Sequence, residues 1–98
     1  MDAWSVYLIR TAGGELYTGI TTDVERRLEA HRAGCGAKYL RGRGPLALVY
    51  RRKLGERGLA LSVERGLKRR TKAEKEALVD SAPSRRKLLR ILAIEPPS

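Results

Sequence analysis

The N-terminal part of the chain alternates between two short apolar runs and a polar turn. Val6–Ile9 is a continuous apolar run of β-forming residues, which is typical of a strand buried on both faces. The segment TAGG at 11–14 supplies the glycines that tight hairpin loops require. Leu16–Ile20 then returns as a second apolar run. The pattern predicts a β-hairpin with strands over 4–10 and 16–20.

The register of this hairpin decides where its two tyrosines lie. A turn centred near residue 12 places Tyr7 and Tyr17 roughly opposite each other on one face. A shift of one residue would send them to opposite faces, because side chains alternate along a strand. The sequence favours the first arrangement and leaves the second open.

A helix is predicted over 21–34, TTDVERRLEAHRAG. Thr22 and Glu25 have the spacing of a capping box, and the Asp23 carboxylate suits the positive end of a helix. Gly34 is a suitable residue for the helix end.

The remainder of the chain predicts one more strand and three more helices. A basic, glycine-rich loop, CGAKYLRGRGP, precedes a third strand that starts at Leu46. Leucine and valine at helical spacing predict a helix from Leu59 to about Arg70. Thr71 and Glu74 form a second capping box, which opens a helix to about Val79, and SAPS starts a last helix over 85–94.

This order of elements, ββαβααα, predicts an α/β fold in which helices flank a three-stranded antiparallel sheet. The length of 98 residues indicates a single domain. We expect that domain to span 1–98, with its motif-bearing core at about 4–79 and a C-terminal helix within about 82–94.

The balance of charge indicates a polyanionic partner. The formal net charge is +10, and 15 arginines outnumber 6 lysines. Arginine presents a planar fork that matches phosphate oxygens. A basic domain of this kind indicates nucleic acid as its partner, although a compositional bias toward arginine would give the same count.

The single cysteine and single histidine limit the chemistry. Cys35 excludes an internal disulfide and a cysteine-based zinc site, and His31 alone excludes a multi-histidine metal centre. The opening MDAWSVYLIR lacks the basic and apolar regions of a signal peptide, and no apolar run has the length of a membrane span. We expect a cytoplasmic protein without membrane contact.

A small set of residues remains as candidates for chemistry. Arg27 and His31 share a helix face, since they are four residues apart. Tyr7 and Tyr17 have a plain alternative as core aromatics with satisfied hydroxyls. Glu64 has a plain alternative as an exposed partner of Lys68 on the same helix.

At these residues the chain resembles the GIY-YIG nuclease family. The two strand motifs that name the family read Ser5-Val6-Tyr7 and Tyr17-Thr18-Gly19 here. Arg27 matches the arginine that the family carries on the next helix, and Glu64 matches its glutamate on a later helix. The stretch LYTGITTDVERRLEAH is similar to the small stand-alone bacterial, YhbQ-like branch of the family. The resemblance spans about Trp4 to Val79 and implies the GIY-YIG fold.

The resemblance implies an endonuclease that hydrolyses phosphodiester bonds with one divalent ion, Mg²⁺ or Mn²⁺. Glu64 would be the metal ligand, which is reasonable because Mg²⁺ retains several waters. Tyr7 or Tyr17 would activate or orient the attacking water, and Arg27 would stabilise the growing phosphate charge. His31 would assist proton transfer or bind phosphate. Tyr39 would contact the scissile phosphate or stack on a base.

Four basic residues are expected to contact the nucleic-acid backbone: Arg26 beside the catalytic helix face, and Lys38, Arg41 and Arg43 in the glycine-rich loop. The expected substrate is DNA, with RNA as an alternative, recognised through phosphates and through shape rather than sequence. Branched or damaged DNA, as in DNA repair, fits such recognition.

One departure from the family pattern concerns an asparagine that many GIY-YIG nucleases place after the metal glutamate. This chain contains neither asparagine nor glutamine, and Thr71 and Lys72 are the nearest candidates to replace it. Two alternatives to the nuclease therefore remain. One is a nucleic-acid-binding module with weak or no cleavage. The other is an interaction protein that binds a protein partner through its C-terminal helices.

Overall fold

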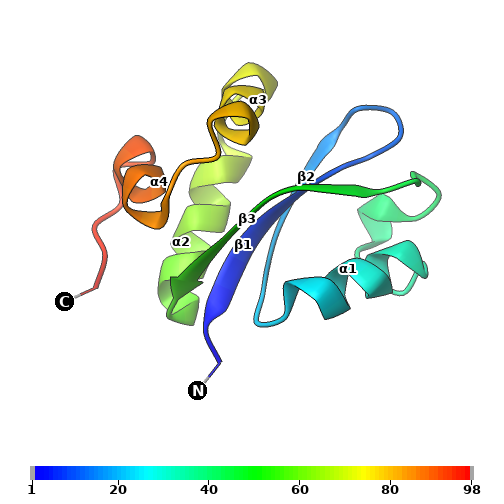
Figure 1. Ribbon diagram of the computed structural model, residues 1–98, viewed down its shortest axis with the longest axis horizontal. Helices are drawn as coiled ribbons and strands as arrows, with labels where there is room; N and C mark the ends of the chain where they lie inside the picture. The colour runs from blue at the N-terminus through cyan, green and yellow to red at the C-terminus, as the bar shows by residue number, and fades with distance from the viewer. Residues whose placement is uncertain (1, 98) are drawn as a thin grey trace.

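The computed structural model describes residues 2–97 and contains three strands, four α-helices and one 3₁₀ turn (Figure 1). Strand order and helix order follow the predicted ββαβααα sequence, with the 3₁₀ turn inside the glycine-rich loop. The elements are β1 (Trp4–Arg10), β2 (Leu16–Thr21), α1 (Val24–Arg32), η1 (Lys38–Leu40), β3 (Ala47–Gly55), α2 (Arg57–Lys68), α3 (Lys72–Ser81) and α4 (Arg85–Ile91).

The sheet confirms the predicted α/β class. It has three antiparallel strands in the order β2-β1-β3, so the first strand in the sequence is central. The apolar run Val6–Ile9 is at most 2% exposed along its length. This burial agrees with the continuous apolar pattern of β1, because a central strand is covered on both faces.

Alternate side chains of β1 enter two separate cores. Val6 and Leu8 pack with the apolar residues of α2, α3 and α4. Tyr7 and Ile9 pack on the opposite face with residues of α1, η1 and the start of β3. Figure 1 shows α1 on one side of the sheet and the other three helices on the other. Within residues 2–97, no helix is both long enough and apolar enough to cross a membrane.

The hairpin register differs from the expected one by two residues. Tyr7 pairs with Gly19, and Tyr17 pairs with Ile9. The facing Tyr7–Tyr17 pair was therefore wrong, because the turn is centred one residue later than expected and Gly14 takes its left-handed position with φ of +91°. A shift by an even number keeps both tyrosines on the same face. They are diagonal neighbours with ring centroids 6.3 Å apart.

The helix ends confirm one of the two predicted capping boxes. Thr71 accepts from the Glu74 N–H while the Glu74 carboxylate accepts from the Thr71 N–H, as predicted for α3. The box at Thr22 was wrong, because Asp23 is the N-cap of α1 and accepts from the Arg26 N–H at 3.1 Å. The last helix is also shorter than expected and ends at Ile91.

Candidate active site

Tyr7 lies on the central strand, and its side chain crosses the edge strand β2. Its ring passes directly over Gly19, the residue paired with it in the hairpin. A Cβ at position 19 would overlap the Tyr7 hydroxyl, so only glycine leaves room for this path. The glycine of the Tyr17-Thr18-Gly19 motif therefore allows the Tyr7 ring to lie against the backbone of β2 while its hydroxyl reaches His31.

His31, in the last turn of α1, meets that hydroxyl. Its Nε2 lies 2.8 Å from Tyr7 Oη, and its Nδ1 accepts from the backbone N–H of Ala37 at 3.0 Å. Because a backbone N–H can only donate, Nδ1 carries a lone pair, and the proton of the neutral ring is on Nε2. His31 therefore donates to Tyr7 Oη, and the Tyr7 hydroxyl proton is directed to another acceptor.

The loop after α1 is built around this imidazole. A Cβ at Gly36 would overlap His31 Nδ1, so glycine allows the chain to turn close against the ring. The next residue then presents its N–H to the ring nitrogen. His31 is only 3% exposed as a result.

Both polar groups of this pair have shifted pKa values. Burial raises the pKa of the Tyr7 hydroxyl to about 12, while the Arg27 guanidinium opposes this increase and Tyr17 and Glu64 add to it. Burial also lowers the pKa of His31, and the positive charge of Arg27 lowers it further. Both groups are therefore neutral at pH 7, so the resting pair consists of a phenol and a neutral imidazole.

Arg27 and Glu64 reach this point from opposite sides of the sheet. Arg27 comes from α1, one helical turn before His31, and Glu64 comes from α2. Each is close enough to act on the charge state of Tyr7, in opposite directions. The structure thus brings together Tyr7 and Glu64, which are 57 positions apart in the sequence.

Tyr17 connects this cluster to the loop. Its ring centroid lies 5.6 Å from that of His31 and 6.1 Å from that of Tyr39, with which it stacks at an interplanar angle of 20°. Tyr39 is 46% exposed. The predicted site residues Tyr7, Tyr17, Arg27, His31, Tyr39 and Glu64 therefore form one continuous cluster.

The carboxylate of Glu64 is the candidate metal ligand. Its side chain is 20% exposed, and Lys68 Nζ lies 3.4 Å from its Oε2. Within residues 2–97, no group of three or more acidic, histidine or cysteine side chains is arranged to hold a metal. A single carboxylate oxygen site fits Mg²⁺, which keeps most of its waters and takes substrate phosphate oxygens. The donor set thus fits one hydrated hard cation, in competition with Lys68.

The four residues predicted to contact the nucleic-acid backbone differ in whether they are engaged within the protein or exposed. Arg43 is engaged within the protein, since it donates to the Tyr39 carbonyl at 2.7 Å and its guanidinium lies 4.3 Å from the centre of the Tyr39 ring. Arg26 is exposed and lines a shallow hollow of about 240 Å³ with Arg27. Lys38 and Arg41 are exposed on and after η1.

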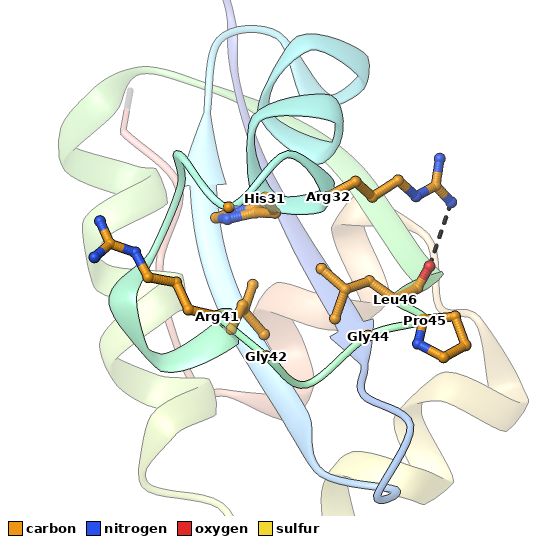
Figure 2. A pocket seen from close by; sticks show the side chains of 9 residues that line it. His31, Arg32, Arg41, Gly42, Gly44, Pro45 and Leu46 are labelled. Carbon is orange, nitrogen blue, oxygen red and sulfur yellow. Dashed lines mark hydrogen bonds between the residues drawn. The ribbon is translucent and has the colours of Figure 1, made fainter.

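A separate hollow lies on the loop side of His31 (Figure 2). It measures about 380 Å³ and is mainly apolar, with the loop between Arg41 and Leu46 facing the end of α1. Arg32 closes one side by donating to the Leu46 carbonyl at 3.3 Å. Figure 2 shows the Arg41 guanidinium directed away from Leu46, which leaves that charge available to an external anion.

Neither Thr71 nor Lys72 is available to replace the asparagine that the chain lacks. The Thr71 hydroxyl is used in the α3 capping box, and Lys72 donates to the Gly14 carbonyl at 2.8 Å. Sequence reasoning missed Lys75 and considered Lys68 only as a partner of Glu64, although the two lysines lie together beside Tyr17. No local pattern connects these lysines to β2, because α2 and α3 are brought there only by the tertiary fold.

Comparison with known proteins places these features in a family. The GIY-YIG catalytic domain matches residues 3–77. The UPF0213 protein YhbQ of Escherichia coli K12 is 57% identical over 79 residues, which cover 81% of this chain and 79% of that protein. A UPF0213 protein of Yersinia enterocolitica is 56% identical over 81 residues, covering 83% of this chain and 84% of its own. The solution structure of the UPF0213 protein BH0048 from Bacillus halodurans has a TM-score of 0.55 at 36% identity and covers 94% of this chain and 98% of its own.

Proposed function

The chain belongs to the GIY-YIG nuclease family, and from that membership we propose that it is a metal-dependent endonuclease that hydrolyses phosphodiester bonds in DNA. The observation that supports this most is the convergence of Tyr7, Arg27, His31 and Glu64 on one point at the edge of β2. Four polar side chains from three elements meet there, next to the exposed Tyr39.

Tyr7 has the role of relaying a proton: Oη takes a proton from the attacking water while its own hydroxyl proton passes to a phosphate oxygen of the substrate. Deprotonating a phenol of pKa about 12 at pH 7 costs about 7 kcal/mol, so a standing phenolate is not the resting state. The hydrogen bond donated by His31 Nε2 stabilises the negative charge that develops on Oη as the proton leaves. In this mechanism His31 is a fixed donor and remains neutral.

Arg27 stabilises the phosphate. Its guanidinium suits the charge that develops on the phosphate oxygens in the transition state. It reaches the same point as the Tyr7 hydroxyl, so attack and charge stabilisation occur at one phosphorus.

Glu64 would hold the divalent cation, Mg²⁺ or Mn²⁺. When bound, this ion would supply Lewis-acid polarisation of the phosphate and lower the pKa of water. Lys68 must leave the Glu64 carboxylate for the ion to bind, since the two side chains are paired at 3.4 Å.

DNA is proposed as the substrate because the chain has a net charge of +10 and exposed cations near the cluster. Arg26, Lys38 and Arg41 would contact backbone phosphates, which fix position but carry no sequence information. The cleavage is therefore expected to follow the shape of the substrate, such as a branch, rather than its sequence. RNA with the same phosphates is tested beside DNA.

The test is a cleavage screen on plasmid, duplex, branched DNA and RNA with Mg²⁺, comparing wild type with Glu64→Gln. The matched control is Glu29→Gln, because Glu29 is an exposed glutamate on α1 that pairs with Arg32 at 3.2 Å. We expect Glu64→Gln to abolish cleavage and Glu29→Gln to retain it. Cleavage that survives Glu64→Gln would contradict the metal assignment.

A second candidate function is a nucleic-acid-binding module without efficient cleavage. It is favoured by the absence of asparagine and by the engagement of Thr71 and Lys72 elsewhere. Salt-dependent binding by the wild type, with no cleavage of any substrate, would select this candidate.

A further inference from the structure

A groove follows the free edge of the sheet beside the catalytic cluster. β2 is an edge strand, and the groove wraps around it from the α1 face to the α2 and α3 face. It measures about 270 Å³ and is lined by Leu16, Tyr17, Thr18, Tyr39, Lys68 and Lys75. Leu16, Thr18 and Lys75 have no part in the proposed catalysis, and Lys68 has one only as the partner that must leave Glu64.

The groove is joined to the catalytic cluster at two points. Tyr17 lies in both, with its ring 5.6 Å from that of His31. Lys68 lies in the groove and pairs with Glu64 of the cluster. A nucleic-acid strand that is cut at the cluster would therefore place the neighbouring nucleotide in this groove.

Two positive charges face the groove from different helices. Lys68 comes from α2 and is 57% exposed in its side chain, and Lys75 comes from α3. Within the part of the chain that the structure describes, Lys75 has no ion-pair partner. When Glu64 binds a cation, Lys68 is also released toward the groove, so both ammonium groups are available to one phosphate.

The other wall is aromatic. Tyr17 and Tyr39 stack on each other, and Tyr39 is 46% exposed. Tyrosine rings beside cations are typical of proteins that bind single strands, because an unpaired base has a free π-face to stack on. The bases of a duplex already stack on one another, so a duplex would use only the lysine charges of the groove and not its tyrosine wall.

We propose that this groove binds one unpaired DNA strand next to the scissile phosphate, so that the substrate class is DNA with a single-stranded arm. Lys68 and Lys75 hold its phosphate, and the Tyr17–Tyr39 wall holds its base. The inference rests on the proposed nuclease function and assigns the substrate of that same site.

The test measures binding, without metal and in the Glu64→Gln background, where Lys68 has lost its carboxylate partner. The probes are a labelled single strand, a duplex and a duplex with a single-stranded arm, each across a range of salt. The variant Lys68→Met with Lys75→Met removes both charges and keeps the aliphatic stems. The matched control, Lys53→Met with Lys87→Met, removes two charges from β3 and α4 at the opposite edge of the sheet.

We expect the groove variant to weaken single-strand and arm binding by roughly tenfold at low salt. Its salt slope for single strands should fall by about 1.4, since each lost phosphate contact contributes about 0.7. Binding to duplex and all binding by the control should change little. Tyr39→Ala should weaken single-strand binding in the same selective way.

Two outcomes overturn the inference alone while Glu64-dependent cleavage persists. One is a groove variant that binds like the control. The other is an equal loss on duplex and on single strand, which would assign the lysines to duplex phosphates. A wild type that binds no nucleic acid would instead reject the nuclease function together with the groove.

Discussion

Tyr7 Oη and His31 Nε2 lie 2.8 Å apart, and the N–H of Ala37 on Nδ1 makes the histidine the donor of this bond. A histidine that acts as a general base needs a lone pair on the nitrogen that faces the group it deprotonates. Here that nitrogen carries the proton and faces a tyrosine. We therefore propose that His31 acts as a positioning residue for Tyr7.

Replacing Tyr7 by phenylalanine should remove catalysis with a small effect on the fold. We expect Tyr7→Phe to lower single-turnover cleavage by roughly 10²- to 10⁴-fold, the range typical of proton-transfer groups. The control is Tyr50→Phe, because Tyr50 is also buried but donates to the Pro83 carbonyl at 2.7 Å on the other side of the sheet. Tyr50→Phe should cost about 1 kcal/mol of stability and keep cleavage. A folded Tyr7→Phe that cuts normally would exclude Tyr7 as the proton acceptor.

His31 should make the stability of the protein depend on pH between 7.5 and 5.5. Its folded pKa is lowered by burial and by Arg27, so the unfolded chain binds more protons as pH falls through the ordinary value near 6.5. Its stabilising contribution is thus present above pH 6.5 and is lost as pH falls toward the folded pKa. Urea unfolding at the two pH values should give a lower free energy at pH 5.5.

The matched comparison is His31→Gln, which removes the only histidine in the chain. The difference between the two pH values should shrink in this variant. The carboxylates with lowered pKa values, such as Glu25 and Glu74, titrate below this window and leave the comparison clear. An unchanged difference in His31→Gln would assign the pH dependence to other groups.

Gly19 should tolerate no side chain. Gly19→Ala places a methyl group against the Tyr7 hydroxyl, and such overpacking typically costs about 1–3 kcal/mol. The displaced hydroxyl should also leave His31, so cleavage should fall with stability. The control is Gly66→Ala in α2, where the new Cβ would lie 3.5 Å from Leu92, an ordinary contact. That change should stabilise by about 0.5–1 kcal/mol in urea unfolding. Equal effects of the two changes would contradict the close approach of Tyr7 to Gly19.

The start of α1 should depend on Asp23 and not on Thr22. Asp23→Ala removes the side-chain acceptor of the Arg26 N–H and should cost about 1 kcal/mol. Thr22 is exposed and lies outside the cap, so Thr22→Ala should be close to neutral in thermal unfolding. The reverse ranking would restore the capping box that the sequence pattern predicts.

The sequence by itself determined the elements and several members of the candidate site. Continuous apolar residues identified β1 as a central strand, and the Thr71–Glu74 spacing identified the start of α3. Arg27 and His31 could be placed on one face because they are four residues apart in one helix. All of these are local properties, since they depend on the period of a helix or strand and on neighbours within one turn.

The tertiary structure decided where these elements meet. The hairpin register, the N–H of Ala37 on His31 and the opening at Gly19 depend on backbone approach between segments that no local period relates. Lys75 joins Tyr17 in the groove across 58 positions because packing on the sheet places α3 beside the edge of β2. Residue types along the chain therefore predicted which side chains are candidates for the site. Only long-range packing decided which partner each of these side chains has.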